Sequence, residues 1–201
     1  MITDPLKTST KEFEEIKKRI TQDSKFRKAL AMRSHFWFFY IYFSHYIEFE
    51  PAKFHKEIFS LTEDEEVRFV TIVAFRGSGK STIISLSYPI WAIIGNQQKK
   101  YPLLIGQTQQ QAKQMLANIK SELETNEVLI KDFGPFEQYA DTWRADSLVL
   151  PQYGARISAI STGENIRGLR HKQTRPDLII CDDVEDADSV RSSDVFPRGY
   201  C

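Results

Sequence analysis

Cysteine is scarce in this chain. Its 201 residues include two, Cys181 and Cys201, which form neither a disulfide framework nor a metal-binding spacing. Residues 1–10 are polar and mixed, so they lack the apolar segment of a secretory signal peptide. These two absences lead us to expect a reducing, cytoplasmic setting.

Long hydrophobic runs are also missing. The most apolar stretch, residues 36–43, is rich in aromatic side chains but far shorter than the roughly 18 apolar residues that a membrane span needs. His35 and His45 flank it. We expect a buried helix that packs on the core and no membrane span, with a membrane or partner contact as the alternative.

Neither sign of charge is in excess, since 27 basic side chains match 27 acidic ones. Wholesale electrostatic wrapping of a nucleic acid is therefore not expected, although a local basic stripe is compatible with this balance. The chain has no internal repeat or low-complexity stretch, and its hydrophobic content of 41% is enough for one core. We expect one domain preceded by an N-terminal extension.

The extension is predicted to be helical. Residues 11–32 are charged but carry apolar side chains at a helical spacing, which predicts an amphipathic helix. Pro51 opens a further short helix, and an acidic link over residues 62–68 follows. We expect a helical extension over residues 1–62 and a core over residues 63–201.

A glycine-rich turn lies between two apolar segments. Residues 76–82 (Arg-Gly-Ser-Gly-Lys-Ser-Thr) follow the apolar run 69–75, and this order predicts a strand, a phosphate-binding loop and a helix. Glycines let backbone N–H groups turn toward phosphate oxygens, a lysine supplies positive charge for the β and γ phosphates, and a hydroxyl ligates Mg²⁺. The residues expected to contact the nucleotide are Ala74, Arg76, Gly77, Ser78, Gly79, Lys80, Ser81 and Thr82.

One position of this loop departs from the general pattern. Ala74 stands where the pattern has glycine. Alanine is tolerable there if the backbone keeps a negative φ. The alternative interpretation is a glycine-rich strand-to-helix turn that binds no nucleotide.

The rest of the core alternates between strands and helices. Residues 103–106 predict a second strand, and Thr108 caps a long helix over residues 109–124 with one apolar face. Residues 148–150 and 155–160 predict a hairpin-like pair. With the phosphate-binding loop, this order predicts an α/β fold, a P-loop NTPase with a mainly parallel sheet flanked by helices.

A further strand ends in acidic residues. The apolar run 178–181 predicts a buried parallel strand, with Asp182 at its carboxyl end. Asp182 is placed to hold Mg²⁺, directly or through water, together with Ser81. Asp183 is a candidate for polarising the attacking water, and Glu185 is the second candidate. The alternative for the acidic residues after the strand is a solvated helix start with N-capping carboxylates.

These residues resemble the ATPase domain of terminase large subunits, the motors that package double-stranded DNA into tailed-phage heads. Arg76, inside the phosphate-binding loop, is characteristic of that family, which also often lacks the first glycine. Residues 163–170 and 175–183 resemble the family's stretch leading into the acidic strand. Residues 51–55, which include His55, lie where terminases place residues near the adenine. The resemblance covers roughly residues 51–191.

The resemblance implies an Mg²⁺-dependent ATPase that powers DNA packaging into procapsids, encoded by a phage or prophage in a bacterial cell. It implies ATP and Mg²⁺ as cofactors. The implied partners are double-stranded DNA, a portal protein and a small terminase subunit, with a homo-oligomer on the portal as an option. Two other functions stay open, namely a nucleotide-binding assembly module or remnant without turnover and a helicase-like P-loop ATPase.

Three arginines have more than one interpretation. The Arg76 guanidinium either stabilises the transition state of phosphoryl transfer or has a structural role, in which it forms a salt bridge with Asp182 or Asp183 or merely covers the loop. Arg167 and Arg170 have three interpretations. They sense the nucleotide, they contact a DNA backbone, or they are solvated side chains of a loop.

The chain departs from the terminase pattern at and after the acidic strand. Terminases place glutamate after the metal-binding aspartate, where this chain has Asp183. Residues 184–201 contain no apolar run for the family's coupling strand, and no nuclease domain is visible. We therefore expect a C-terminally incomplete ATPase core with weak hydrolysis, an unpaired edge beside the acidic strand, and either marginal solubility or a partner chain.

Overall fold

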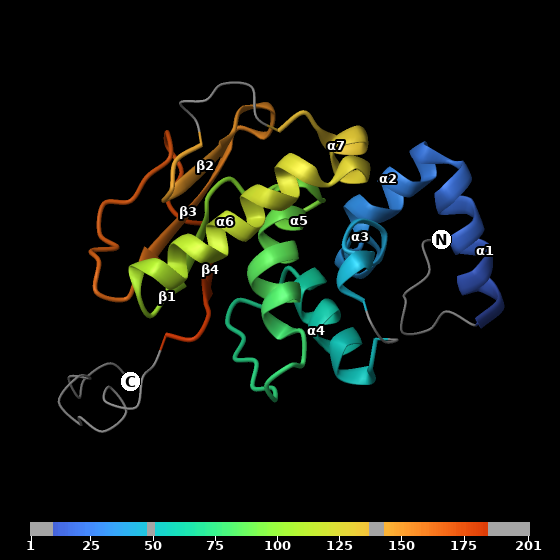
Figure 1. Cartoon of the computed structure of the whole chain (residues 1–201), viewed down its shortest axis with the longest axis horizontal. Helices are drawn as coiled ribbons and strands as arrows, with labels where there is room; N and C mark the ends of the chain where they lie inside the picture. The colour runs from blue at the N-terminus through green and yellow to red at the C-terminus, as the bar shows by residue number, and fades with distance from the viewer. Residues whose placement is uncertain (1–9, 48–50, 137–142, 185–201) are drawn as a thin grey trace.

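The computed structural model describes residues 10–47, 51–136 and 143–184, which form a mixed β-sheet with helices packed around it (Figure 1). The strands are β1 (Pro102–Gly106), β2 (Ser147–Leu150), β3 (Ala155–Ser161) and β4 (Leu178–Cys181). The helices are α1 (Thr10–Gln22), α2 (Ser24–Arg33), α3 (His35–Tyr42), α4 (Lys53–Glu63), α5 (Tyr88–Ile94), α6 (Gln109–Thr125) and α7 (Glu127–Phe133). Shorter helical segments are η1 (Ser44–Tyr46), η2 (Thr82–Ser87) and η4 (Pro151–Tyr153). None of the helices in these ranges is long and apolar enough to cross a membrane.

The strand order in the sheet is β2-β3-β1-β4. β1 pairs in parallel with both β3 and β4, whereas β2 pairs antiparallel with β3. The α/β class, the parallel pairs and the hairpin-like pair were predicted, and the structure confirms them. Because β1, β3 and β4 are parallel, their carboxyl ends at Gly106, Ser161 and Cys181 lie at the same end of the strands in the sheet.

Helix α6 lies across one face of the sheet (Figure 1). Thr108 caps it as predicted, because its side chain accepts a hydrogen bond from Gln111 N at 3.2 Å. On this face Leu104 and Ile180 join a large apolar cluster that continues into the N-terminal helices. On the other face Leu103, Ile105 and Ile160 form a smaller cluster. The side chains that pack against this second cluster are Leu169 and Val184.

The N-terminal helices surround a buried aromatic segment. The predicted buried helix over residues 36–43 is confirmed, since α3 buries Trp37 and Phe38 completely. The predicted single helix over residues 11–32 is wrong in one respect. Asp23 interrupts it, and its carboxylate accepts a hydrogen bond from Phe26 N at 3.0 Å, so that a second helix starts there.

The segment before the glycine-rich loop is not a strand, so the predicted strand over residues 69–75 is wrong. Phe69 and Val73 are 96% and 93% exposed, and no residue of this segment pairs with β1–β4. A strand forms only by pairing, which local hydrophobicity cannot guarantee. β4 is also less buried than predicted, since Ile179 and Cys181 are exposed. Among the described strands β4 lies at the end of the sheet and pairs with β1 alone.

Candidate phosphate-binding site

The loop over residues 76–82 turns sharply at its two glycines. Gly77 and Gly79 have φ angles of 80° and 75°, in the left-handed region that favours glycine. Gly79 O then accepts from Ile83 N at 3.1 Å as the helix begins. Ala74 is not among the described non-glycine residues with positive φ. Its backbone therefore has the negative φ that alanine requires at this position.

The predicted helix after the loop is present and contains a π-helical stretch. Residues 82–87 (η2) have the wider π turn and run directly into α5. Pro89 stands at the start of α5 and has no N–H to donate, which disturbs the α-helical ladder behind it. The stretch carries two buried hydroxyls, Ser85 and Ser87. The Ser87 hydroxyl donates to Ile83 O at 2.9 Å.

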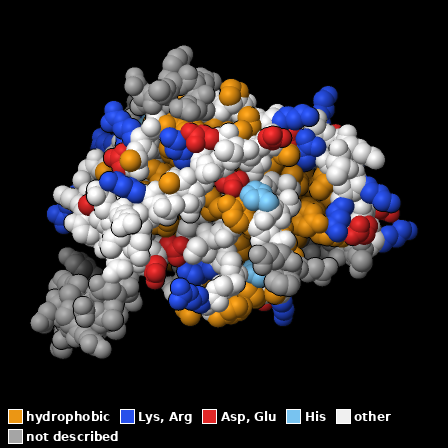
Figure 2. Space-filling view, viewed as in Figure 1, with side chains coloured by type: hydrophobic (Ala, Val, Ile, Leu, Met, Phe, Trp, Pro, Cys, Tyr) orange, Lys and Arg blue, Asp and Glu red, His pale blue; other side chains and the backbone are white. Residues whose placement is uncertain are grey.

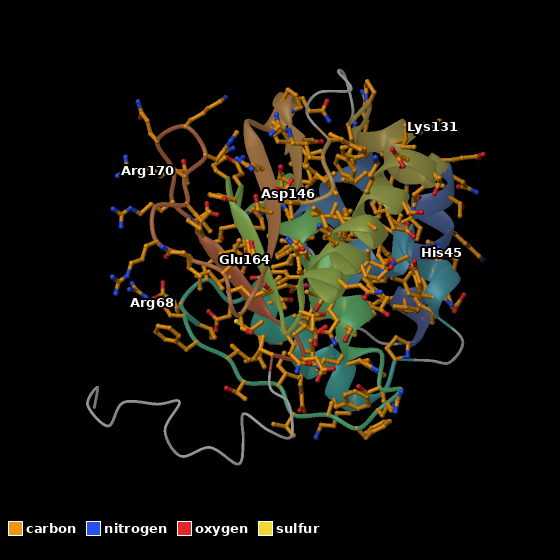
Figure 3. The ribbon with its side chains drawn as sticks, turned by 60° about the vertical axis from the view of Figure 1, so that its left-hand side comes forward. His45, Arg68, Lys131, Asp146, Glu164 and Arg170 are labelled. Carbon is orange, nitrogen blue, oxygen red and sulfur yellow. The ribbon has the colours of Figure 1, made fainter. Side chains whose placement is uncertain are left out.

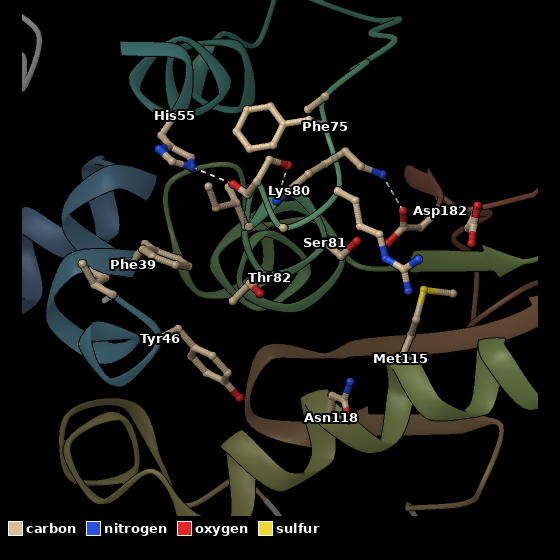
Figure 4. A pocket seen from close by; sticks show the side chains of 18 of the residues that line it. Phe39, Tyr46, His55, Phe75, Lys80, Ser81, Thr82, Met115, Asn118 and Asp182 are labelled. Carbon is tan, nitrogen blue, oxygen red and sulfur yellow. Dashed lines mark hydrogen bonds and ion pairs between the residues drawn. The ribbon is translucent and has the colours of Figure 1, made fainter. Parts of the chain in front are cut away.

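The loop lysine and the acidic strand meet in space. Lys80 Nζ lies 2.9 Å from Asp182 Oδ1 (Figure 4). Ser85 Oγ donates to Asp182 Oδ2 at 2.7 Å. Burial alone would raise the pKa of Asp182. The hydrogen bonds from Ser85, Lys80 and Ser81 outweigh burial and hold that pKa below its usual value. Asp182 is therefore a carboxylate at neutral pH.

His55 ties helix α4 to the loop. Its Nε2 donates to Ser78 O at 2.7 Å (Figure 4). Its Nδ1 accepts from Ala52 N at 3.0 Å. Because Nδ1 accepts a backbone N–H, the ring proton is on Nε2. His55 thus fixes the loop backbone at the residue between the two glycines.

A cavity of about 1130 Å³ opens over this loop. All of the nucleotide-contacting residues expected from the sequence line it: Ala74, Arg76, Gly77, Ser78, Gly79, Lys80, Ser81, Thr82 and His55. Asp182 and Asp183 line it as well, whereas Glu185 lies outside the described residues. The structure therefore brings the two predicted halves of the site together.

The arginines differ in their relation to the cavity. Arg76 is exposed and lines it, and among the described residues it forms no ion pair with Asp182 or Asp183. Arg167 and Arg170 are not among the lining residues. Asp183 is exposed and has a φ of 53°, so its backbone adopts a conformation that most side chains avoid.

Sequence reasoning missed the other side of the cavity. Phe39, Tyr46 and Asn118 contribute to it from α3, η1 and α6. On the face of the molecule shown in Figure 2, hydrophobic side chains gather near the middle, between α6 and the N-terminal helices. Tyr46 is held by a 2.9 Å hydrogen bond from its hydroxyl to Glu122. No local signal marked these residues, because they come from separate helices.

Ser85 was also missed, although a signal existed. It follows Ser81 by four residues, a spacing that places both hydroxyls on the same side of a helix.

Comparison with known protein families, with curated proteins and with solved structures gives no match. The site is therefore interpreted from its own geometry.

Proposed function

We propose that this chain is an Mg²⁺-dependent ATPase of the P-loop NTPase type. One observation carries the proposal. A loop with two left-handed glycines opens a helix, and its lysine lies 2.9 Å from a carboxylate at the carboxyl end of a parallel strand. A helix N-terminus and a lysine suit phosphate, and an aspartate beside a hydroxyl suits Mg²⁺.

The residues of the site fit a nucleotide with its metal ion. Lys80 and the backbone N–H groups of the loop would hold the phosphates. Ser81 and Asp182 would hold Mg²⁺, which prefers oxygen ligands and commonly takes only one or two carboxylates from the protein. A bound metal ion would neutralise charge that develops on the phosphate oxygens. The aromatic side of the cavity, with Phe39 and Tyr46, leaves room for the base.

The chain's own residues would then have separate tasks. With nucleotide bound, Lys80 would hold the phosphates and the Asp182 carboxylate would be available to the metal ion. Arg76, exposed at the rim without an ion pair among the described residues, supplies positive charge to the transition state. Asp183 orients and polarises the attacking water, with Glu185 as the alternative.

We further propose that the ATPase drives the packaging of double-stranded DNA, as a terminase large subunit does in a phage-infected or lysogenic bacterial cell. Support comes from the sequence resemblance, above all Arg76 inside the loop and the acidic strand that follows residues 163–170. A portal protein and a small terminase subunit would be its partners, with assembly of several copies on the portal.

A second candidate is a module that binds nucleotide without turnover. It is favoured by Asp183, which is exposed and one methylene shorter than the glutamate that terminases place there. Such a module would keep Lys80 and Asp182 for binding and lack an effective group on the water.

The test is Mg²⁺-dependent ATP hydrolysis by the purified chain, with nucleotide binding measured in parallel. Lys80→Ala should abolish turnover and weaken binding, and Asp183→Asn should lower kcat by roughly 100-fold or more with binding retained. Lys18→Ala, an exposed change on α1, is the control. Turnover that survives Lys80→Ala would refute the ATPase, and binding without turnover in the wild type would favour the second candidate.

A further inference from the structure

A basic loop joins the parallel strands β3 and β4. We call residues 162–177 the crossover loop. The crossover loop has four basic side chains against two carboxylates, although the whole chain is neutral. Arg170 of this loop and Arg68 both point outward on the same side of the molecule (Figure 3).

The crossover loop is held in a defined shape. His171 and Thr174 exchange two backbone hydrogen bonds of 2.9 Å, which close a tight turn around Lys172. Arg167 N donates to Asn165 Oδ1 at 2.9 Å. Leu169 packs against the smaller apolar cluster of the sheet. The loop therefore presents its cations from fixed backbone positions.

These cations form no ion pair within the described part of the chain. Its basic side chains are exposed and form no ion pair there: Arg167, Arg170, Lys172 and Arg175. The two carboxylates of the loop bind backbone N–H groups and pair with none of these cations. Glu164 accepts from Ser161 N at 3.0 Å, and Asp177 accepts from the backbone N–H groups of Lys100 and Tyr101 at 2.7 and 2.8 Å.

A second layer of basic groups lies beneath the turn. The Arg156 guanidinium carbon lies 5.9 Å from the centre of the Tyr101 ring, and the same ring contacts His171. The buried atoms Arg156 Nε and His171 Nε2 have no hydrogen-bond partner among the described residues. Burial, followed by the positive charges of Lys172 and Arg156, lowers the pKa of His171, which favours the neutral ring.

We propose that the crossover loop contacts the phosphodiester backbone of a nucleic acid, with duplex DNA as its substrate. Unpaired arginines and lysines at fixed positions suit a row of phosphates, and their contacts carry no base specificity. The choice of duplex DNA rests on the proposed packaging function. No crossover-loop residue lines the phosphate-binding cavity, so the two sites can be tested separately.

The experiment measures binding of a labelled duplex of about 30 base pairs, by fluorescence anisotropy over a salt series. The variant combines Arg170→Gln, Lys172→Gln and Arg175→Gln. The matched control combines Lys11→Gln, Lys18→Gln and Lys25→Gln, which removes the same charge from exposed positions on α1 and α2. We expect about tenfold weaker binding and a salt slope lower by about 2 to 3 in the loop variant alone.

Three outcomes overturn the proposal: no duplex binding at low salt, equal losses in both triple variants, or an unchanged salt slope. Equal binding of single-stranded DNA or duplex RNA would overturn the choice of duplex DNA while supporting the backbone contact. ATP hydrolysis and melting temperature of the loop variant should match the wild type. A failed ATPase would show in the Lys80→Ala comparison and leave the binding result unaffected.

Discussion

The charge of Asp182 depends on groups that meet only in the folded chain. Ser85 Oγ lies 2.7 Å from its Oδ2, and Lys80 Nζ lies 2.9 Å from its Oδ1. Ser85 therefore belongs to the site, although it lines no part of the cavity. It acts as a positioning residue that keeps the carboxylate ionised and fixed in orientation.

Replacing Ser85 by alanine should raise the pKa of Asp182, because it removes a hydrogen bond to the ionised form. If ATP hydrolysis requires ionised Asp182, the acidic limb of the kcat/KM profile should move to higher pH. Ser87→Ala is the control, since it removes a buried hydroxyl of the same π-helical stretch that does not contact Asp182. Identical acidic limbs for Ser85→Ala and the wild type would contradict this role.

His55 offers a second test at this scale. His55→Ala leaves Ser78 O without its donor, and the loss of one such hydrogen bond is worth about 1 kcal/mol. We therefore expect roughly fivefold weaker nucleotide binding, measured by titration calorimetry. His45→Ala should bind normally, since His45 is bonded to Glu122 and does not line the cavity. Normal binding by His55→Ala would argue against the anchor.

At the scale of elements, a buried ion pair joins α2 to α7. Arg27 donates to both carboxylate oxygens of Asp132, at 2.6 and 2.8 Å, and the Tyr42 hydroxyl donates to the same group at 2.8 Å. Burial would raise the pKa of Asp132, but Arg27 and Tyr42 hold it below its usual value. The aromatic helix α3 is thereby tied to both neighbours.

Asp132→Asn should destabilise the fold by about 3 kcal/mol at neutral pH, because it leaves Arg27 with no anion. A carboxyl group with a lowered folded pKa adds stability that is complete above its unfolded pKa and is lost as the pH falls through the folded value. Denaturant unfolding should therefore give a difference between variant and wild type that shrinks below about pH 4.

The control for this prediction is Glu124→Gln, which removes the exposed Lys120–Glu124 pair of 3.6 Å. It should change the stability by less than about 0.5 kcal/mol. A loss for Asp132→Asn no larger than this would contradict the structural role of the Arg27–Asp132 pair.

Elements with strong local signals were predictable from the sequence. Thr108 and the apolar face behind it located α6, and the aromatic run located α3. The prediction of a strand over residues 69–75 was wrong, because an apolar run does not indicate whether a partner strand pairs with it. The Arg27–Asp132 pair was not foreseen either, since 105 residues separate its members.

The same limit applies to the site at the scale of the whole molecule. The glycine-rich loop follows from a local motif and the acidic half from a strand end, so both were predicted as parts of one site. Their meeting at 2.9 Å required the sheet. The side of the cavity formed by Phe39, Tyr46 and Asn118 arises from three separate helical segments, whose packing no short pattern encodes.

The exposed segment before the loop should be the first site of limited proteolysis. Arg68 and Arg76 are exposed and lie in extended or turn backbone, so trypsin should cut there before it cuts the helices. ATP with Mg²⁺ should slow the cut after Arg76, which lines the cavity, more than the cut after Arg68. Mass spectrometry of a timed digest measures both rates, and equal slowing of the two would contradict this prediction.

Within the described part of the chain, β4 has one unpaired edge, and the same molecule exposes Phe69, Val73 and Phe75. Each presents backbone groups or apolar side chains that a neighbouring copy can engage. Aggregation of this protein should therefore depend strongly on its concentration, because the rate at which two copies collide rises with the square of the concentration. Dilute preparations should keep their light scattering constant, whereas concentrated ones should slowly become turbid. The Val73→Lys variant should become turbid more slowly than the wild type.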